Sequence, residues 1–295
     1  MRLQSDTTTM KTYPNCKINL GLHVMRKRDD GYHDLETIFV PVSLHDELDI
    51  SPANTFSFLQ DGIAIDGNPD SNLVVRAYHL LQQHSGSRLG NVEIRLTKKI
   101  PTGAGLGGGS SDAAFTLVML NKIFNLGIQT KTLQSLAAKL GADCAFFIEN
   151  IAAFATGIGD QLSPLPLNPL LKYKLLLVKP DEFVSTAEAY RDITPRSQRT
   201  HSEPIDLRKA LDNDIHLWKN TIVNDFENSV FPKHPRLKKI KSELYDAGAL
   251  YAAMSGSGAT IYGIFQNNND IDNLKNLFNN DNNFVAICDT NITNI

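Results

Sequence analysis

Alternating apolar and polar residues mark several short strands along the chain. In residues 18–24 every second side chain is apolar, so one face is buried while Lys17 and Asn19 share the other. The Asp-Gly pair at 30–31 predicts a reversal into a second strand at 38–42, which makes a hairpin. Further strands are predicted at residues 47–50, 55–59, 92–96, 172–178, 261–265 and 284–287.

Apolar residues at helical spacing predict the helices between these strands. A run at 113–124 follows a glycine-rich loop and is long enough for a helix. Thr130 is expected to cap a helix that ends at Gly141. A helix over 215–226 carries Trp218, the single tryptophan, which we expect in the core. Other helices are predicted at 72–84, 237–245 and 271–277, so the patterns by themselves indicate a mixed α and β protein.

Length and composition narrow the class of protein. The 295 residues suggest two domains, at ~150 residues each, and we place the boundary to give domains 1–160 and 161–295. Hydrophobic content of 42% and charged content of 21% are typical of a soluble globular enzyme. A net charge of −3 provides no general attraction to nucleic acid or to a membrane, and we expect neither as a partner.

The chain has no features of a secreted or membrane protein. No apolar run approaches the roughly 18 residues of a membrane span, and residues 1–12 are polar, so we expect the mature chain to be the whole chain. Cys16, Cys144 and Cys288 are odd in number, far apart and without metal-ligand spacing. A reducing cytoplasm therefore fits better than a disulfide framework.

The glycine-rich stretch at 101–114, Pro-Thr-Gly-Ala-Gly-Leu-Gly-Gly-Gly-Ser-Ser-Asp-Ala-Ala, is the clearest candidate for chemistry. Five of the seven residues at 103–109 are glycine, and a helix is expected to follow. Glycines allow backbone N–H groups to converge, and a helix N-terminus adds unpaired N–H groups and partial positive charge. We therefore predict a phosphate site. The alternative is a flexible turn in which Ser or Asp only caps the helix.

Several known glycine loops do not fit this stretch. Residues 103–108 match Gly-x-Gly-x-x-Gly, but no acidic residue occurs from 113 to 142, where a dinucleotide site needs one for the ribose. Ser110 follows Gly109 where the Walker pattern has lysine. A protein-kinase loop would continue into a strand, whereas a helix is expected here. A phosphate loop of another kind remains.

The stretch at 101–114 resembles the ATP loop of the GHMP kinases, named after galactokinase, homoserine, mevalonate and phosphomevalonate kinases. Four more segments resemble those of one member of the family in their order and spacing. That member is an enzyme of isoprenoid precursor synthesis whose acceptor carries a cytidine diphosphate group. These are Pro-Asn-Cys-Lys-Ile-Asn-Leu at 14–20, Asp-Gly-Tyr-His at 30–33, Leu-Gly-Ala-Asp at 140–143 and Met-Ser-Gly-Ser-Gly-Ala-Thr at 254–260. One departure is Ala145, where the family usually has proline.

The resemblance implies an α+β, two-domain GHMP kinase fold. An N-terminal domain like the second domain of ribosomal protein S5 precedes a ferredoxin-like domain, and the active site lies between them. It also implies a cytoplasmic enzyme, a monomer or weak homodimer, that uses ATP and Mg²⁺ to phosphorylate a hydroxyl of a small cytidylyl acceptor. Two alternatives stay open: another GHMP kinase of the homoserine or mevalonate type, and a nucleotide-binding protein without catalysis.

The resemblance assigns roles to particular residues. Asp143 is the expected general base, and Lys17 the cation that stabilises the developing alkoxide and Asp143. Their alternatives are a carboxylate bonded to local N–H groups and a solvated strand lysine. Substrate contacts are implied for Asn19, Tyr32, His33 and Tyr190, where Tyr32 and Tyr190 sandwich a cytosine and His33 bonds its edge, although a helical Tyr190 also fits a core position.

The remaining implied contacts are with ATP. Asn72 and Lys98 are expected near the adenosine, with solvated surface residues as the alternative. Ser110 and Ser111 add hydroxyls, one of which reaches Mg²⁺, or they only cap the helix; the metal ligands are left open. The expected loop contacts are Pro101, Thr102, Gly103, Ala104, Gly105, Leu106, Gly107, Gly108, Gly109, Ser110 and Ser111.

Overall fold

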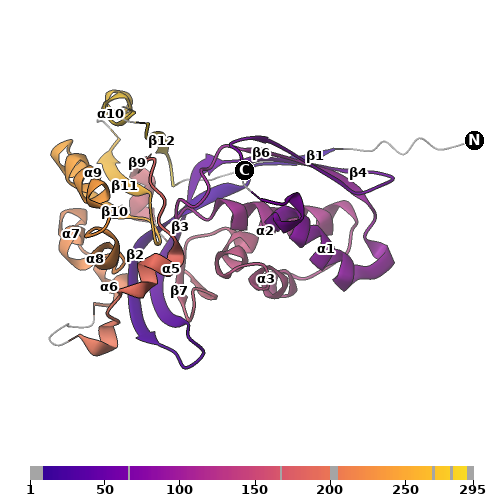
Figure 1. Ribbon diagram of the computed structural model, residues 1–295, viewed down its shortest axis with the longest axis horizontal. Coiled ribbons are helices and arrows are strands. Elements are labelled where there is room, and N and C mark those ends of the chain that lie inside the picture. Colours follow the sequence, from indigo (N-terminus) through magenta and orange to yellow (C-terminus); the bar gives the residue numbers. More distant parts are fainter. Residues whose placement is uncertain are drawn as a thin grey trace, which may run out of the picture.

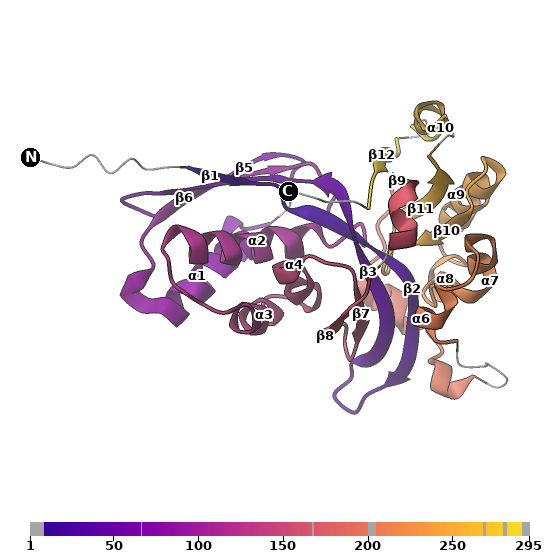
Figure 2. The ribbon, with the colours of Figure 1, turned by 180° about the vertical axis from the view of Figure 1, so that it is seen from behind.

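Three four-stranded sheets organise the part of the chain that the structure describes, residues 9–65, 67–166, 168–199, 205–267, 270–279 and 282–290 of a computed structural model. In Figure 1 one sheet and its helices lie on the right and another with its helices on the left. A long curved hairpin runs between them, and Figure 2 shows the same order from behind. Among the described residues no helix is long and apolar enough to cross a membrane.

The hairpin consists of β2 (Asn15–Lys27) and β3 (His33–His45), as the alternation predicts. β7 (Ala153–Thr156) and β8 (Gln161–Pro164) extend its sheet in the order β2-β3-β7-β8, with all neighbours antiparallel. The predicted domain boundary at residue 160 lies at the start of β8 and stays a prediction.

The second sheet has the order β1-β4-β6-β5 and carries the predicted glycine loop at one strand end. β5 runs parallel to β6 and the other neighbours are antiparallel. Apolar residues of β4 and β6 pack against three helices, so one sheet face and the helices share a core. The elements are β1 (Met10–Thr12), β4 (Glu47–Pro52), β5 (Ser57–Gly62), β6 (Val92–Lys98), α1 (Leu73–Ser85), α2 (Gly108–Ile123) and α3 (Thr130–Ala138).

The third sheet has the ferredoxin-like order β10-β11-β9-β12 with all neighbours antiparallel. Helices connect β9 to β10 and β11 to β12, so each connection crosses over a strand inserted between its two ends. The strands are β9 (Tyr173–Lys179), β10 (Tyr251–Met254), β11 (Ile261–Gln266) and β12 (Phe284–Cys288). The helices are α5 (Thr186–Arg191), α6 (Leu207–Ala210), α7 (Trp218–Thr221), α8 (Glu227–Val230), α9 (Pro235–Asp246) and α10 (Ile271–Phe278).

Short helical turns complete the chain. A four-residue helix, α4 (Phe146–Glu149), follows a 3₁₀ turn that carries Asp143. The 3₁₀ turns are η1 (Pro69–Ser71), η2 (Gly86–Arg88), η3 (Ala142–Ala145), η4 (Asn168–Lys172), η5 (Arg196–Gln198) and η6 (Ile215–Leu217).

Three local predictions were wrong. The helix after the glycine loop begins at Gly108 rather than at 113, because Gly107 at φ 69° starts it within the glycine run. Thr130 does not cap α3; Gln129 occupies that position and makes no side-chain bond to the helix. Residues 215–226 form η6 and α7 and then leave the helix, because the backbone at Val223 pairs with Leu22 of β2 at an N···O distance of 3.0 Å.

Trp218 is in the core as expected. The strands β1, β7, β8 and β10 were not predicted. β1 has three residues and β7 and β8 have four each, which is too short for a clear alternation, and β10 is buried on both faces. The three cysteines are free and buried.

Asp225 ties the C-terminal helices to the hairpin. Its side chain is fully buried and accepts a hydrogen bond from the Val24 N–H at 2.9 Å. Arg196 donates to both of its oxygens at 2.8 and 3.0 Å, and Arg199 donates at 2.9 Å. Burial opposes ionisation, but the two guanidinium groups outweigh it and hold the pKa of Asp225 below its usual value.

We expect Asp225→Ala to lower the free energy of unfolding by about 3 kcal/mol, because it leaves two guanidinium groups and a buried N–H without their acceptor. Urea unfolding at pH 7 measures this. Glu243→Ala is the control, since its pair with Lys239 at 3.4 Å is exposed and its loss changes stability by less than about 0.5 kcal/mol. Equal losses in both variants would contradict a structural role for Asp225.

Candidate active site

The glycine loop connects β6 to α2 and adopts a backbone that only glycine accepts readily. Gly105 and Gly107 have φ of 73° and 69°, in the left-handed region. A Cβ at Gly105 would lie 2.1 Å from the Ser255 carbonyl oxygen. Glycine therefore lets the loop pass directly against the segment between β10 and β11.

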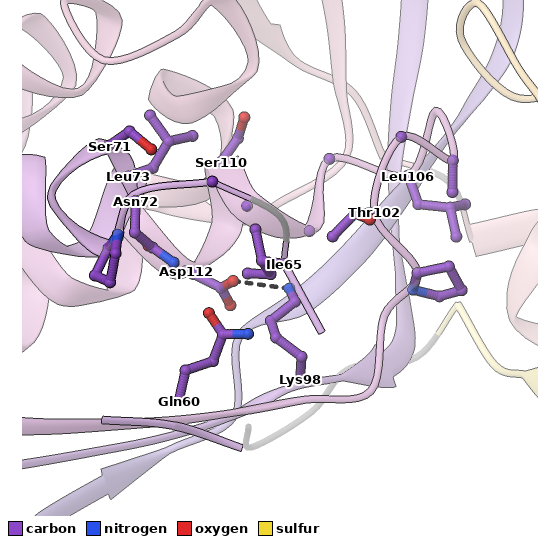
Figure 3. A pocket seen from close by; sticks show the side chains of 18 of the residues that line it. Gln60, Ile65, Ser71, Asn72, Leu73, Lys98, Thr102, Leu106, Ser110 and Asp112 are labelled. Carbon is purple, nitrogen blue, oxygen red and sulfur yellow. Dashed lines mark hydrogen bonds and ion pairs between the residues drawn. The ribbon is translucent and has the colours of Figure 1, made fainter. Parts of the chain in front are cut away.

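A pocket of about 610 Å³ opens above this loop. We name it the ATP pocket after the predicted ATP contacts that line it. Figure 3 shows Gln60, Asn72, Lys98 and Asp112 pointing into the same part of it. Asn72 also caps α1, because its side-chain oxygen accepts from the Val74 N–H at 2.9 Å. The predicted ATP contacts that line the pocket are residues 101–110 with Asn72 and Lys98.

Ser111 is the predicted ATP contact that the structure does not bring to this pocket. Its side chain is fully buried, and its hydroxyl has no hydrogen-bond partner among the residues that the structure describes. Ser110, one residue earlier, lines the ATP pocket and the neighbouring one. The structure thus separates two serines that the sequence left equivalent.

A buried ion cluster forms the floor of the ATP pocket. Lys98 is only 2% exposed, so the solvated alternative for it was wrong. Its ammonium donates to Asp112 at 2.8 Å and to Asp46. Asp46 also accepts from the Ile100 N–H at 2.8 Å, at the start of the loop. Sequence reasoning missed both carboxylates, and Asp46 lies 52 residues from Lys98.

A second pocket, of about 500 Å³, contains both predicted catalytic residues and two of the four predicted substrate residues, and we name it the acceptor pocket. Lys17, Asn19, Asp143 and Tyr190 line it, and residues 256–258 line it from the C-terminal sheet. The pocket shares Gly103, Gly105, Gly107 and Ser110 with the ATP pocket. The two pockets therefore meet across the glycine loop.

Lys17 is the centre of this second pocket. It is 3% exposed, so it is not a solvated strand lysine. Its ammonium lies 2.6 Å from Asn19 Oδ1, 3.2 Å from the Gly105 carbonyl oxygen and 3.3 Å from Asp143 Oδ2. Asn19 is oriented for this contact because its amide nitrogen donates to Thr37 at 2.9 Å.

Asp143 lies in η3 with its side chain 32% exposed, beside the buried lysine. Ala145, where the family usually has proline, has φ −61°, which is the value that proline would impose. The turn therefore keeps its geometry without the proline. Among the described residues, no three His, Cys, Asp or Glu side chains gather as a metal site.

Of the three predicted cytosine-binding residues, Tyr190 lines the second pocket and His33 contacts Tyr190. The rings of His33 and Tyr190 stack at 4.8 Å and 23°, and Phe226 packs edge-on against Tyr190. Burial lowers the pKa of His33 and raises that of Tyr190 to about 12. Tyr32, the residue before His33, is 62% exposed, and neither it nor His33 lines the pocket. The sandwich of a cytosine between Tyr32 and Tyr190 stays a prediction.

Comparison with known proteins identifies the family. Residues 72–157 match the GHMP kinases N terminal domain, and residues 207–281 match the GHMP kinases C terminal. The chain is 52% identical to the 4-diphosphocytidyl-2-C-methyl-D-erythritol kinase of Bacteroides thetaiotaomicron, over 87% of this chain and 92% of that protein. The chain belongs to the GHMP kinase family.

Solved structures agree with this assignment. This GHMP kinase superposes on a crystal structure of 4-(cytidine 5'-diphospho)-2C-methyl-D-erythritol kinase with a TM-score of 0.80 and 30% identity, covering 95% of this chain and 99% of that one. A homoserine kinase from Cytophaga hutchinsonii shares the fold at a TM-score of 0.74 and 18% identity, over 98% of this chain and 96% of that one. The predicted two-domain fold is confirmed, and the protein is an ATP-dependent small-molecule kinase.

The cluster of Lys98, Asp46 and Asp112 predicts that the free energy of unfolding depends on pH. Burial, and then the neighbouring Asp46, raise the pKa of Asp112 to about 8, against the opposing effect of Lys98. The folded protein therefore holds a proton that the unfolded chain releases near pH 4. Stability from this group is complete below pH 4 and is lost as the pH rises toward 8.

We expect Asp112→Asn to flatten this dependence, because asparagine is neutral at every pH. Between pH 6 and 8 the free energy of unfolding should fall in the wild type relative to the variant, by at most about 1.4 kcal/mol per pH unit for one proton. Urea unfolding at several pH values measures it. Asp212→Asn, at an exposed position, controls for the loss of one aspartate. Parallel curves for wild type and Asp112→Asn would contradict a buried proton.

Proposed function

We propose that this GHMP kinase transfers the γ-phosphoryl group of ATP to the 2-hydroxyl of 4-diphosphocytidyl-2-C-methyl-D-erythritol, giving the 2-phosphate and ADP. The observation that carries the proposal is the Lys17–Asp143 pair at the junction of two pockets. It occurs in a chain that is 52% identical, over most of its length, to a kinase of that substrate. The reaction belongs to the non-mevalonate route to isoprenoid precursors.

Asp143 acts as the general base. It accepts the proton of the substrate 2-hydroxyl while that oxygen attacks the γ-phosphorus and the bond to the ADP oxygen breaks. Lys17 lies 3.3 Å from this carboxylate and stabilises the negative charge that develops on the attacking oxygen. Because Lys17 is buried and bonded to Asn19 and Gly105, its charge is held in place before substrate binds.

The glycine loop holds ATP. Backbone N–H groups of residues 103–110 and the first turn of α2 bind the β- and γ-phosphates, where the partial charge of the helix is positive. Lys98 and Asn72 contact the adenosine side of the pocket. Mg²⁺, when bound, neutralises phosphate charge, and the Ser110 hydroxyl is the side chain that would reach it, since Ser110 lines both pockets.

The cytidine of the acceptor binds at the outer end of the second pocket. Tyr190 and Tyr32 provide faces for stacking, and His33 bonds the base edge, which supplies the selectivity that stacking lacks. Tyr190 moves away from His33 to admit the base, because the two rings are in contact without it. Asn19, beside Lys17, contacts the acceptor near its hydroxyl.

We propose that this kinase works in the cytoplasm. Three free, buried cysteines are consistent with a cytoplasmic protein. We also propose that it works as a monomer or weak homodimer, with a domain boundary near residue 160.

Asp143→Asn should lower kcat by about 10²–10⁴-fold, since the base is lost while the ATP pocket is unchanged. A coupled ADP-release assay with Mg²⁺ and the cytidylyl substrate measures this, and the KM for ATP should change little. Lys131→Asn, at an exposed position in α3, serves as a control. A near-normal kcat would remove Asp143 as base, whereas no substrate-dependent turnover in the wild type would contradict the proposed function.

CMP should compete with the acceptor and raise its apparent KM without changing kcat, because the cytosine site lies apart from the ATP pocket. Homoserine and mevalonate should give no ADP release. Turnover of either, without inhibition by CMP, would favour another GHMP kinase. ATP binding without ADP release under any condition would favour a nucleotide-binding protein without catalysis.

A further inference from the structure

Phe183 is an apolar ring in an unusual place. It is 70% exposed, and no large apolar side chain among the described residues is more exposed. Its neighbours fix the backbone on one side: Val184 is buried, and Ser185 caps α5 by accepting from the Glu188 N–H at 3.1 Å. The backbone that carries the ring is therefore anchored, and a loose loop does not explain why the ring is exposed.

The ring lies where the ATP and acceptor pockets meet. A Cβ on Gly103 would come within 2.9 Å of Phe183 Cε2, so the ring rests directly against the glycine loop. Gly103 lines both pockets, and Phe183 lines the acceptor pocket. The ring thus connects the segment after β9 to the loop that holds the phosphates, on the solvent side.

Water is a competing acceptor at this position. The Asp143 side chain is 32% exposed, so solvent reaches the base. A water molecule activated by Asp143 would attack the γ-phosphorus, the bond to the ADP oxygen would break, and the products would be inorganic phosphate and ADP. Phosphoryl transfer to an alcohol in such a site requires that water be excluded once both substrates are bound.

We propose that Phe183 covers the junction of the two pockets when both substrates are bound and keeps water from the γ-phosphate. This inference rests on the proposed kinase function and adds a positioning residue to it. The substrates fill the acceptor pocket beneath the ring, and the apolar ring closes the side that is open to solvent without them. Its removal leaves the lysine, the base and the glycine loop intact but admits water.

The test compares Phe183→Ala with the wild type by measuring ADP, inorganic phosphate and phosphorylated acceptor in the same reaction. The wild type should form one phosphorylated acceptor per ADP. In Phe183→Ala the ratio of ADP to phosphorylated acceptor should rise about threefold or more, with the excess recovered as inorganic phosphate. Phe183→Tyr should restore the ratio, because the ring is kept.

Leu171→Ala is the matched control, since Leu171 is also exposed, at 52%, and lines neither pocket. A ratio of ADP to phosphorylated acceptor of one in Phe183→Ala would overturn the inference. This holds even if the KM for ATP or acceptor rises, because Phe183 would then be a binding contact only. Phe183→Leu, with an intermediate ratio expected, replaces the alanine variant if that variant unfolds. If the wild type forms no phosphorylated acceptor, the proposed function has failed, and the inference fails with it.

Discussion

The buried Lys17 ammonium is the interaction on which the rest of the site depends. A buried cation without partners would destabilise the fold by several kcal/mol, so its partners must be in place before ligands arrive. They come from three separate segments: Asn19 of β2, the Gly105 carbonyl of the loop and Asp143 of η3. One charge therefore holds Asp143, the glycine loop and β2 in a fixed relation.

The C-terminal sheet joins this arrangement at the same carbonyl. Ser255 donates from its hydroxyl to the Gly105 oxygen at 2.9 Å, so that oxygen accepts from a lysine and a serine far apart in sequence. Tyr262 of β11 donates to the Asn19 carbonyl at 2.8 Å. The Ser255 bond requires the loop to lie close to the segment between β10 and β11, which the absence of a Cβ at Gly105 allows.

On the other side of the loop, Lys98 is a second buried cation whose partners come from separate segments. Lys98 ends β6, Asp112 lies in the second turn of α2, and Asp46 follows β3. The contacts of both carboxyl groups with the Lys98 ammonium clamp both ends of the glycine loop to the sheet. Two buried lysines, one beside each pocket, thus hold the glycine loop, at which the proposed phosphoryl transfer takes place.

The sequence by itself determined the hairpin and the glycine loop and pointed to Lys17 and Asp143 as candidates, because strand alternation, glycine spacing and short family segments are local patterns. It did not separate Ser110 from Ser111, nor pair Lys98 with Asp46 and Asp112, nor end the helix before Val223. Each of these depends on contacts between distant segments: how α2 is rotated on the sheet, where β6 meets β3, and where the chain after α7 pairs with β2. The position of Phe183 against Gly103 is of the same kind, because only the packing of the C-terminal sheet on the loop brings that ring to the junction of the pockets.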